Sequence, residues 1–227
     1  MVEFGAVNNA SSYPSAHSWA RIRRQRPFDF VLKRTLDIAV SLSMLLFLAP
    51  VLILIAVLIR LESPGSPFFS QLRYGQHGKK IRIYKFRSMR SDLCDPSGVA
   101  QTVENDPRVT RFGAFLRKSN LDELPQLWNV LIGDMSLVGP RCHAIGMLAG
   151  GVLYEHLVPG YHKRHVMRPG LTGLAQMRGL RGPTDKPSKA RARINADLHY
   201  IENYSFMLDV KILIGTVWSE LNGGKGF

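Results

Sequence analysis

The sequence predicts a mainly α-helical fold with a short β-hairpin, associated with a membrane through a re-entrant helix. Three observations predict this fold. An apolar stretch over residues 38–61 is interrupted near its middle by Pro50, and basic residues lie on both of its flanks. Two short apolar and aromatic runs then follow around a glycine-containing turn, which is typical of a hairpin. Most of the remaining apolar residues recur at helical spacing.

The composition limits the classes of partner. The chain has 227 residues, and 30 Lys and Arg against 17 Asp and Glu give a formal charge of +13. That length suits one domain with accessory segments. The charge fits nucleic acid, an anionic membrane surface or phosphorylated substrates, and does not choose among them. Cys94 and Cys142 form no Cys-x-x-Cys pair, so we expect neither a zinc site nor a disulfide framework.

Composition divides the chain into four segments. Residues 1–27 are rich in Ser, Asn, Ala and Pro and end in clustered arginines, which indicates a mobile basic arm. The arm could bind anionic lipid head groups or remain a solvated tail. Residues 28–62 are the expected re-entrant membrane helix. Residues 63–222 are the expected cytosolic domain, with catalytic candidates named below, and residues 223–227 are a tail.

The apolar stretch is long enough to cross a bilayer, for which about 20 residues suffice. Pro50 removes a helix hydrogen bond and bends the axis. A crossing helix would leave one basic flank on the wrong side, whereas a helix–break–helix keeps both on the cytoplasmic face. The sequence therefore favours the re-entrant form over a span, and either over a buried core helix. Lys33 and Arg34 are expected at head-group level, where Asp37 could pair with one of them.

The hairpin is expected over residues 68–74 and 81–89, around the turn at 75–78. Alternation in the second run places Lys85 and Arg87 on one face. That face could bind a phosphate or be a solvated basic strand.

The remaining elements follow from periodicity and turn residues. Loops are expected at residues 91–106 and 136–141, and helices at 109–118, 126–131, 144–158, 190–203 and 206–221. In the last helix an apolar stripe indicates core, or less often a membrane interface: Val210, Leu213, Ile214, Val217, Trp218 and Leu221.

Asp122 and Glu123 form an acidic pair in a basic setting, which is made by Arg108, Arg111, Arg117, Lys118 and Arg141. An ionised carboxylate can act as a nucleophile or a metal ligand, and nearby cations keep it ionised. Pro125 is tolerated only in the first turn of a helix, so the pair lies at or just before a helix start, where phosphate binds well. Acid–base chemistry, metal binding and helix capping all remain open for the pair.

Several blocks, in order over residues 28–222, resemble the bacterial sugar transferases, the monotopic polyprenyl-phosphate phosphoglycosyl transferases. Any one block is weak, whereas the ordered set is specific. The blocks are Lys33-Arg-Thr-Leu-Asp37, Tyr84-Lys-Phe-Arg-Ser-Met89, Leu121-Asp-Glu-Leu-Pro-Gln126, Gly133-Asp-Met-Ser-Leu-Val-Gly-Pro-Arg141, Arg168-Pro-Gly-Leu-Thr-Gly-Leu-Ala-Gln176, and residues 200–213.

The resemblance implies a membrane enzyme on the cytoplasmic face of a bacterial inner membrane. Asp122 would attack the phosphorus next to the sugar in a UDP-sugar, release UMP, and hold the phosphosugar until undecaprenyl phosphate takes it. Glu123 matches the family position that holds Mg²⁺. The positions near the phosphates and the metal match Lys85, Arg117, Arg141, Arg181 and Asp209. For Arg181 and Asp209 an ordinary loop arginine and a helix-capping aspartate remain alternatives.

Arg87 and Pro140 complete the expected substrate-binding set, because they lie in the same blocks as Lys85 and Arg141. Two departures from the family stand out. Cys142 follows Arg141 where the family usually has proline, which affects the stiffness of this loop and the fit of the sugar. Ala49 precedes Pro50 where many relatives have serine. Larger members carry further membrane helices and a domain ahead of this region, so we expect a short, catalytically sufficient form.

The blocks Cys142-His-Ala144 and Arg181-Gly-Pro-Thr-Asp185 resemble members that move glucose- or galactose-phosphate for exopolysaccharides. The alternative function is a non-enzymatic, basic membrane-anchored adaptor, in which the acidic pair caps a helix and pairs with Arg117. Nucleic acid is not an expected partner, because no reader motif accompanies the basic residues. A homo-oligomer is possible, and the sequence does not set its size.

Overall fold

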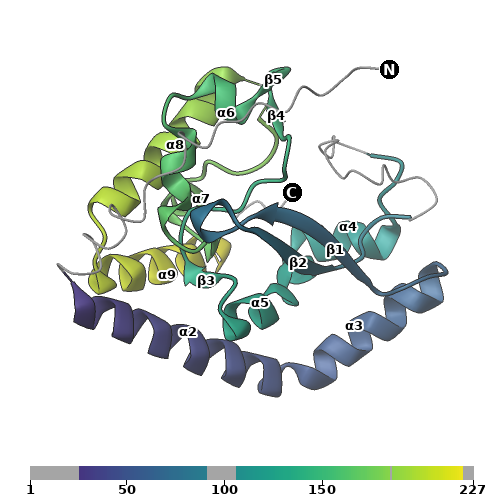
Figure 1. The fold of residues 1–227 in the computed structure, drawn as a ribbon. Helices are drawn as coiled ribbons and strands as arrows, with labels where there is room; N and C mark the ends of the chain where they lie inside the picture. The colour runs from purple at the N-terminus through teal and green to yellow at the C-terminus, as the bar shows by residue number, and fades with distance from the viewer. Residues whose placement is uncertain (1–25, 91–105, 185, 222–227) are drawn as a thin grey trace.

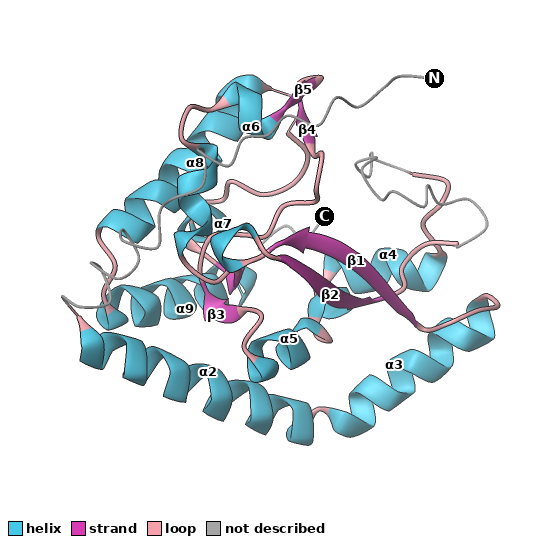
Figure 2. Cartoon of the chain, viewed as in Figure 1, coloured by secondary structure: helices cyan, strands magenta, loops and turns pink. Residues whose placement is uncertain are grey.

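The computed structural model describes residues 26–90, 106–184 and 186–221. Most of the predicted basic arm, the predicted loop up to residue 105, and the predicted tail lie outside these residues. Within them, helices dominate and the strands pair into small two-stranded sheets (Figure 2). This confirms the predicted mainly helical fold.

The apolar stretch forms two helices, α2 (Pro27–Phe47) and α3 (Ala49–Glu62), bent by 62° at Leu48. Pro50 lies in the first turn of α3 and has no amide proton to donate. Among the described residues no single helix has the length and hydropathy to cross a membrane. Of these residues, only the two helices of this bent pair, taken together, have both. The predicted break at Pro50 is confirmed. Figure 1 shows the pair along one edge of the molecule, with the other elements on its concave side.

Polar side chains of α2 face the rest of the fold. Lys33, Asp37 and Ser41 are buried at intervals of four residues, on one side of the helix. Arg34 donates to the carbonyls of Val130 and Leu131 at 2.7 and 2.8 Å. Lys33 pairs with Asp209, and Asp37 accepts hydrogen bonds from Ser136 Oγ and the Leu137 amide, so the expected pairing of Asp37 with Lys33 or Arg34 is wrong. These side chains attach α2 to the protein instead.

The opposite faces of α2 and α3 are apolar and exposed. Leu46 and Phe47 are 69% and 84% exposed at the bend, and Ile53 and Leu61 on α3 are 65% and 78% exposed. Contiguous apolar surface of this extent indicates an interaction site. Helix α2 thus faces the fold with buried polar residues and α3 with Ile55 and Ile59, and both helices have an apolar side away from the fold.

The predicted hairpin is confirmed by strands β1 (Phe68–Tyr74) and β2 (Lys80–Phe86), which pair antiparallel. The 3-10 turn η1 (Gln76–Gly78) joins them. β2 ends three residues before the predicted end of its run, at Phe86, whose ring stacks on Phe68 at 5.4 Å.

Two short helices flank the acidic pair. Helix α4 (Arg111–Lys118) begins at Thr110, whose side chain accepts a hydrogen bond from the Gly113 amide at 2.9 Å. The 3-10 turn η3 (Leu121–Glu123) follows, and then helix α5 (Gln126–Ile132). Both predicted helices are confirmed to within two residues, as is the position of the pair just before a helix start.

Two predictions over residues 136–158 are wrong. Residues 136–138 form strand β3 (Ser136–Val138), which pairs parallel with β6 (Gly170–Thr172), rather than part of a loop. The predicted helix over 144–158 is a small hairpin of β4 (Leu148–Ala149) and β5 (Val152–Leu153), followed by the short α6 (Tyr154–Leu157). The left-handed backbone at Gly150 and Gly151, with φ of 56° and 81°, makes a turn that ends any helix there.

The 3-10 segment η4 (Tyr161–Val166) and helix α7 (Leu174–Met177) precede helices α8 (Pro187–Glu202) and α9 (Phe206–Leu221). The bounds of α9 match the prediction, but its stripe is not core. Val217 and Trp218 are 58% and 70% exposed, whereas Asp209 and Ile212 are buried. Ile214, Val217 and Trp218 of the predicted stripe are therefore exposed, while Leu213 packs against the core.

The main core joins α5, β3, α8 and α9 beneath the hairpin. It includes Ile83, Leu127, Val130, Met135, Leu137, Tyr200 and Ile212. This cluster holds the segment that carries the acidic pair against the hairpin strand that carries Lys85.

Candidate active site

The acidic pair lies in a short turn that three local features shape. Asn120 takes a left-handed conformation, with φ of 55°, and reverses the chain after α4. Pro125 occupies the N-cap position of α5 with φ of −59°. Asp122 and Glu123 therefore lie between two helices, and Asp122 is buried with 7% of its surface exposed.

Glu123 is held by two cations. Its Oε1 accepts a hydrogen bond from Lys85 Nζ at 2.6 Å, and its Oε2 accepts one from Arg141 Nη1 at 3.2 Å. The second Arg141 nitrogen also donates to Oε1. Burial tends to raise the pKa of Glu123, but Arg141 and Lys85 together lower it well below its usual range. Glu123 is therefore a fixed negative charge that orients two basic side chains.

Asp122 is held much less tightly. Its Oδ2 lies 3.7 Å from Lys85 Nζ, beyond hydrogen-bond distance. Burial and the adjacent Glu123 raise the pKa of Asp122, while Lys85, Arg117 and Arg141 oppose the rise. Because little hydration or direct pairing masks this carboxylate, its ionised form is suited to attack an electrophile.

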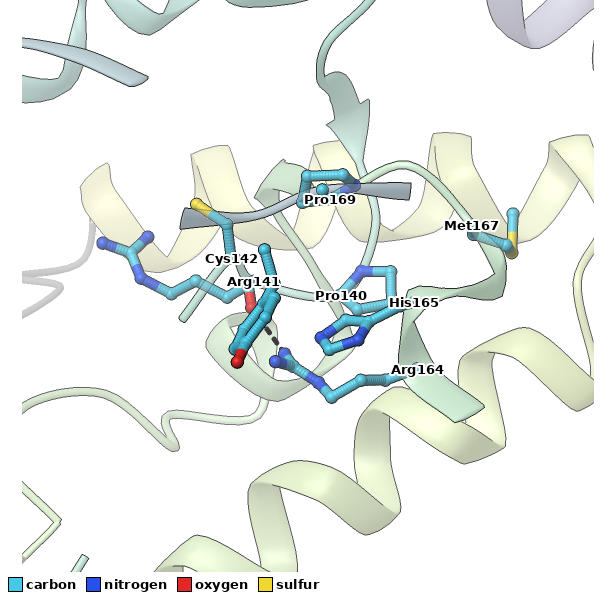
Figure 3. A pocket seen from close by; sticks show the side chains of 9 residues that line it. Pro140, Arg141, Cys142, Arg164, His165, Met167 and Pro169 are labelled. Carbon is cyan, nitrogen blue, oxygen red and sulfur yellow. Dashed lines mark hydrogen bonds between the residues drawn. The ribbon is translucent and has the colours of Figure 1, made fainter. Parts of the chain in front are cut away.

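Arg141 reaches the pair from the end of β3. The chain after β3 passes so close to β6 that a Cβ on Gly170 would lie 2.1 Å from the Gly139 nitrogen. The Gly170 amide donates to the Pro140 carbonyl at 2.9 Å. Arg164 donates to the Arg141 carbonyl beside a small pocket that Pro140 and His165 also line (Figure 3). Pro140 thus supports the Arg141 loop, and Arg141 contacts the pair directly.

Arg181 is linked to the site through Glu220, which the sequence analysis missed. Arg181 forms an ion pair with Glu220, and Glu220 Oε2 accepts a hydrogen bond from Asn120 Nδ2 at 3.1 Å. The only sequence signal for Glu220 is an isolated acid near the end of an apolar helix. Arg117, in the last turn of α4, acts on Asp122 through its charge.

The structure does not bring Arg87 and Asp209 to the acidic pair. Arg87 donates to the backbone carbonyl and Oγ of Ser63 at 2.7 and 3.0 Å, at the end of α3. Since β2 ends at Phe86, the alternation that grouped Arg87 with Lys85 does not extend to it. Asp209 is buried in α9 and accepts hydrogen bonds from Lys33 at 2.8 Å and Tyr200 at 2.7 Å. Within the described residues no hydrogen bond or ion pair joins Asp209 to Asp122 or Glu123.

The carboxylates of the acidic pair suit Mg²⁺ binding with the help of waters and substrate phosphates, and do not form a complete protein cage for the ion. Among the described residues no three His, Cys, Asp or Glu side chains are grouped as a metal cage. Mg²⁺, however, is commonly held by one or two carboxylates with waters and substrate phosphates. Glu123 and Asp122 fit that mode, because both belong to the same short turn.

Comparisons with known proteins show the family of this chain. The model of the bacterial sugar transferase family matches residues 28–223. The chain is 68% identical over 199 residues to the exopolysaccharide production protein PSS of Rhizobium leguminosarum bv. phaseoli, covering 88% of this chain and 100% of that protein. It is 47% identical over 197 residues to the UDP-glucose:undecaprenyl-phosphate glucose-1-phosphate transferase of Escherichia coli (strain K12), covering 87% of this chain and 40% of that enzyme.

A further relative carries a different sugar in its name. The UDP-N-acetylgalactosamine-undecaprenyl-phosphate N-acetylgalactosaminephosphotransferase of Aeromonas hydrophila is 39% identical over 197 residues, which cover 87% of this chain and 45% of that enzyme. The chain therefore spans less than half the length of the two named transferases and the whole of the Rhizobium protein.

Proposed function

The chain belongs to the bacterial sugar transferase family and is a transferase, and from this premise we propose that it transfers a hexose-1-phosphate from a UDP-sugar to undecaprenyl phosphate. The observation that carries the proposal is the buried, loosely paired Asp122 beside Glu123, which holds Lys85 and Arg141 in place. Membership in a transferase family leaves no support for the non-enzymatic adaptor.

The proposed reaction has two displacements at one phosphorus. A carboxylate oxygen of Asp122 attacks the phosphorus next to the sugar, the bond to the bridging oxygen breaks, and UMP leaves with that oxygen and the electron pair. An oxygen of undecaprenyl phosphate then attacks the same phosphorus. The bond to Asp122 breaks, the carboxylate is restored, and the product is undecaprenyl diphosphate sugar.

The cations around the pair suit both steps. Lys85 and Arg141 are already oriented by Glu123 before a substrate arrives, so little reorganisation is needed when negative charge develops on the phosphoryl oxygens. Arg117 adds positive charge near Asp122. Arg141 can give a phosphate two parallel donors, and its side chain is 39% exposed. Arg181 and Pro140 support this site from the adjoining loops.

Mg²⁺ is the proposed cofactor, with Glu123 as its protein ligand. When bound, the ion would neutralise charge on the substrate diphosphate. The chain's own task there is to keep Glu123 ionised, which its lowered pKa supports.

We place the exposed apolar side of α2 and α3 in the cytoplasmic leaflet of the bacterial inner membrane, with both ends of the pair on the cytoplasmic side. The 62° bend and the apolar outer face support this placement. Single cysteines introduced near Ala20 and Gln76 should both react only from the cytoplasmic side. Labelling of one of them from outside would show a span instead.

Glucose or galactose is the proposed sugar, and initiation of exopolysaccharide assembly is the proposed role. Support comes from the Rhizobium relative, named for exopolysaccharide production, and from a glucose-1-phosphate transferase that is more similar than the N-acetylgalactosamine enzyme. UMP release measured against a panel of UDP-sugars tests this choice. Preference for an N-acetylated sugar would overturn it.

A labelling experiment tests the covalent step. The protein in detergent is incubated with a UDP-sugar radiolabelled in the phosphate next to the sugar, without undecaprenyl phosphate. Wild-type protein should retain acid-stable label, Asp122→Asn should retain none, and Lys80→Met, a change on the exposed strand residue, should label like wild type. Absence of retained label in wild-type protein that releases UMP would sink the covalent mechanism.

A further inference from the structure

Arg164 and Asp197 form a buried ion pair that the proposed chemistry does not use. Arg164, in η4, is 1% exposed, and Asp197, in α8, is 2% exposed. Arg164 Nε donates to Asp197 Oδ2 at 3.0 Å, and an Nη nitrogen donates to the same oxygen. Burial of two charges is costly, and such a pair is weak support for stability by itself. A further contact of Arg164 indicates a more specific role.

The third contact of Arg164 reaches the active-site loop. The same Nη nitrogen donates to the backbone carbonyl of Arg141. In Figure 3 that carbonyl points to Arg164, while the Arg141 side chain extends the other way, where its guanidinium meets Glu123. Because the carbonyl and the side chain belong to one residue, the orientation of this peptide governs the direction in which the guanidinium leaves the loop.

The backbone carbonyls of three consecutive loop residues, 140–142, each accept a hydrogen bond from another part of the fold. The Gly170 amide donates to Pro140 at 2.9 Å, Arg164 donates to Arg141, and Arg73 Nη1 donates to Cys142 at 2.9 Å. Cys142 follows Pro140-Arg141 and has no pyrrolidine ring to restrict the backbone. Hydrogen bonds from buried and half-buried arginines supply the restriction instead.

We propose that Arg164, anchored by Asp197, is a positioning residue that aims Arg141 at the acidic pair through the Arg141 carbonyl. Its activity test rests on the proposed phosphosugar transfer. The competing explanation is that the ion pair only stabilises the fold. The two differ in whether an effect at position 164 depends on the side chain at position 141.

A double-mutant cycle separates them. Arg164→Lys keeps the charge beside Asp197 but loses the planar group that reaches both acceptors at once. We expect it to lower kcat for UMP release by about 10- to 100-fold, because small misplacement of a catalytic group is costly. In an Arg141→Lys background, the logarithm of the fold-change in kcat caused by Arg164→Lys should be less than about a third as large, because the effects of mutations at contacting residues do not add. Equal fold-changes in both backgrounds would overturn the proposal.

Arg34→Lys is the matched control. Arg34 also donates to two backbone carbonyls, those of Val130 and Leu131, which belong to the end of α5 and not to the Arg141 loop. Its effect on kcat, whatever its size, should be the same in both position-141 backgrounds. Coupling of Arg34 to position 141 as strong as that of Arg164 would overturn the specific assignment.

Hydrogen exchange gives a readout that needs no activity. The amides of Gly139, Arg141 and Cys142 should exchange faster in Arg164→Lys than in wild type, and at the wild-type rate in Arg34→Lys. Unchanged exchange in Arg164→Lys overturns the proposal. If wild-type protein releases no UMP from any UDP-sugar, the proposed function fails and exchange alone decides this inference. Should Arg164→Lys not fold, Asp197→Asn takes its place, because it weakens the anchor and leaves the Arg164 donors.

Discussion

Two of the buried charge clusters in the described residues hold their aspartates differently: the α2 cluster, with Lys33, Tyr200 and Asp209, and the site cluster, with Lys85, Asp122, Glu123 and Arg141. In the α2 cluster, Asp209 accepts hydrogen bonds on both oxygens, from Lys33 at 2.8 Å and Tyr200 at 2.7 Å. In the site cluster, Asp122 has its closest cation, Lys85, at 3.7 Å. Both aspartates are almost fully buried. Burial is thus common to both aspartates, and the two differ in how completely they are paired.

The comparison shows that a shifted pKa does not identify a reactive acid by itself. Burial is the largest cause of the raised pKa at both Asp122 and Asp209. What separates them is access and partners. Arg141, which lines the site, has a side chain 39% exposed. Lys33, in contrast, is buried and donates hydrogen bonds to Asp209 and, at 2.7 Å, to the Val138 carbonyl. In the α2 cluster the hydrogen bonds hold helices together. In the site cluster the incompletely paired Asp122 and the partly exposed Arg141 can still bind a substrate.

The largest expected effect is on the free energy of unfolding, when the α2 cluster is changed. Asp209→Asn leaves the Lys33 ammonium buried without a counter-charge, so the free energy of unfolding should fall by about 3–5 kcal/mol. Urea unfolding in detergent measures it. The double variant Lys33→Met/Asp209→Asn should recover part of the loss, because no unpaired charge remains. Loss of UMP release out of proportion to the loss of folded protein would contradict the separation of the clusters.

The two acids of the site should respond in opposite directions. Glu123 has a lowered pKa, so its stabilisation is present above its unfolded value of 4.5 and is lost as pH falls through the folded value. At neutral pH, Glu123→Gln should therefore cost about 1–3 kcal/mol of unfolding free energy. Asp122 has a raised pKa, so its ionised form opposes folding at neutral pH, and Asp122→Asn should raise Tm. A lower Tm for Asp122→Asn would contradict the incomplete pairing of that acid.

Lys85 should set the acid limb of the pH profile. Among the groups that lower the pKa of Asp122 it is the strongest. Lys85→Met should therefore move the acid limb of UMP release upward by about one pH unit. The exposed Lys80 on the same strand supplies the control, since Lys80→Met should leave the limb in place. An unmoved limb in Lys85→Met would assign it to a group other than Asp122.

The smallest expected effect lies at the edge of the site. Glu220→Gln removes the charge that holds Arg181 and keeps an oxygen for Asn120. Partly exposed ion pairs are weak, so kcat/KM should fall by about threefold. Glu155→Gln, which alters a half-exposed contact with His162 at 3.4 Å, should leave kcat/KM unchanged. A fall in kcat/KM of about 100-fold in Glu220→Gln would show instead that Glu220 belongs to the site cluster.

Features that depend on nearby residues were predictable from the sequence. The bend at Pro50, the hairpin, the helices on either side of the acidic pair and the bounds of α9 all follow from periodicity, turn residues and proline chemistry. Asp122 and Glu123 were identified as a pair for the same reason, since they are neighbours in the chain and Pro125 places them before a helix. The ordered blocks identified the family.

Only the tertiary structure decided which charges meet. Lys33 and Asp209 are 176 positions apart, and Arg164 and Asp197 are 33 apart. The alternation of a strand indicated Arg87 as a partner of Lys85, but the end of β2 turned it to α3. Glu220 had only the weak signal of an isolated acid near the end of an apolar helix, and nothing local indicated that Arg164 pairs with Asp197. The reason is physical: propensity and periodicity act over a few residues, whereas the partner of a buried charge is set by how distant elements pack.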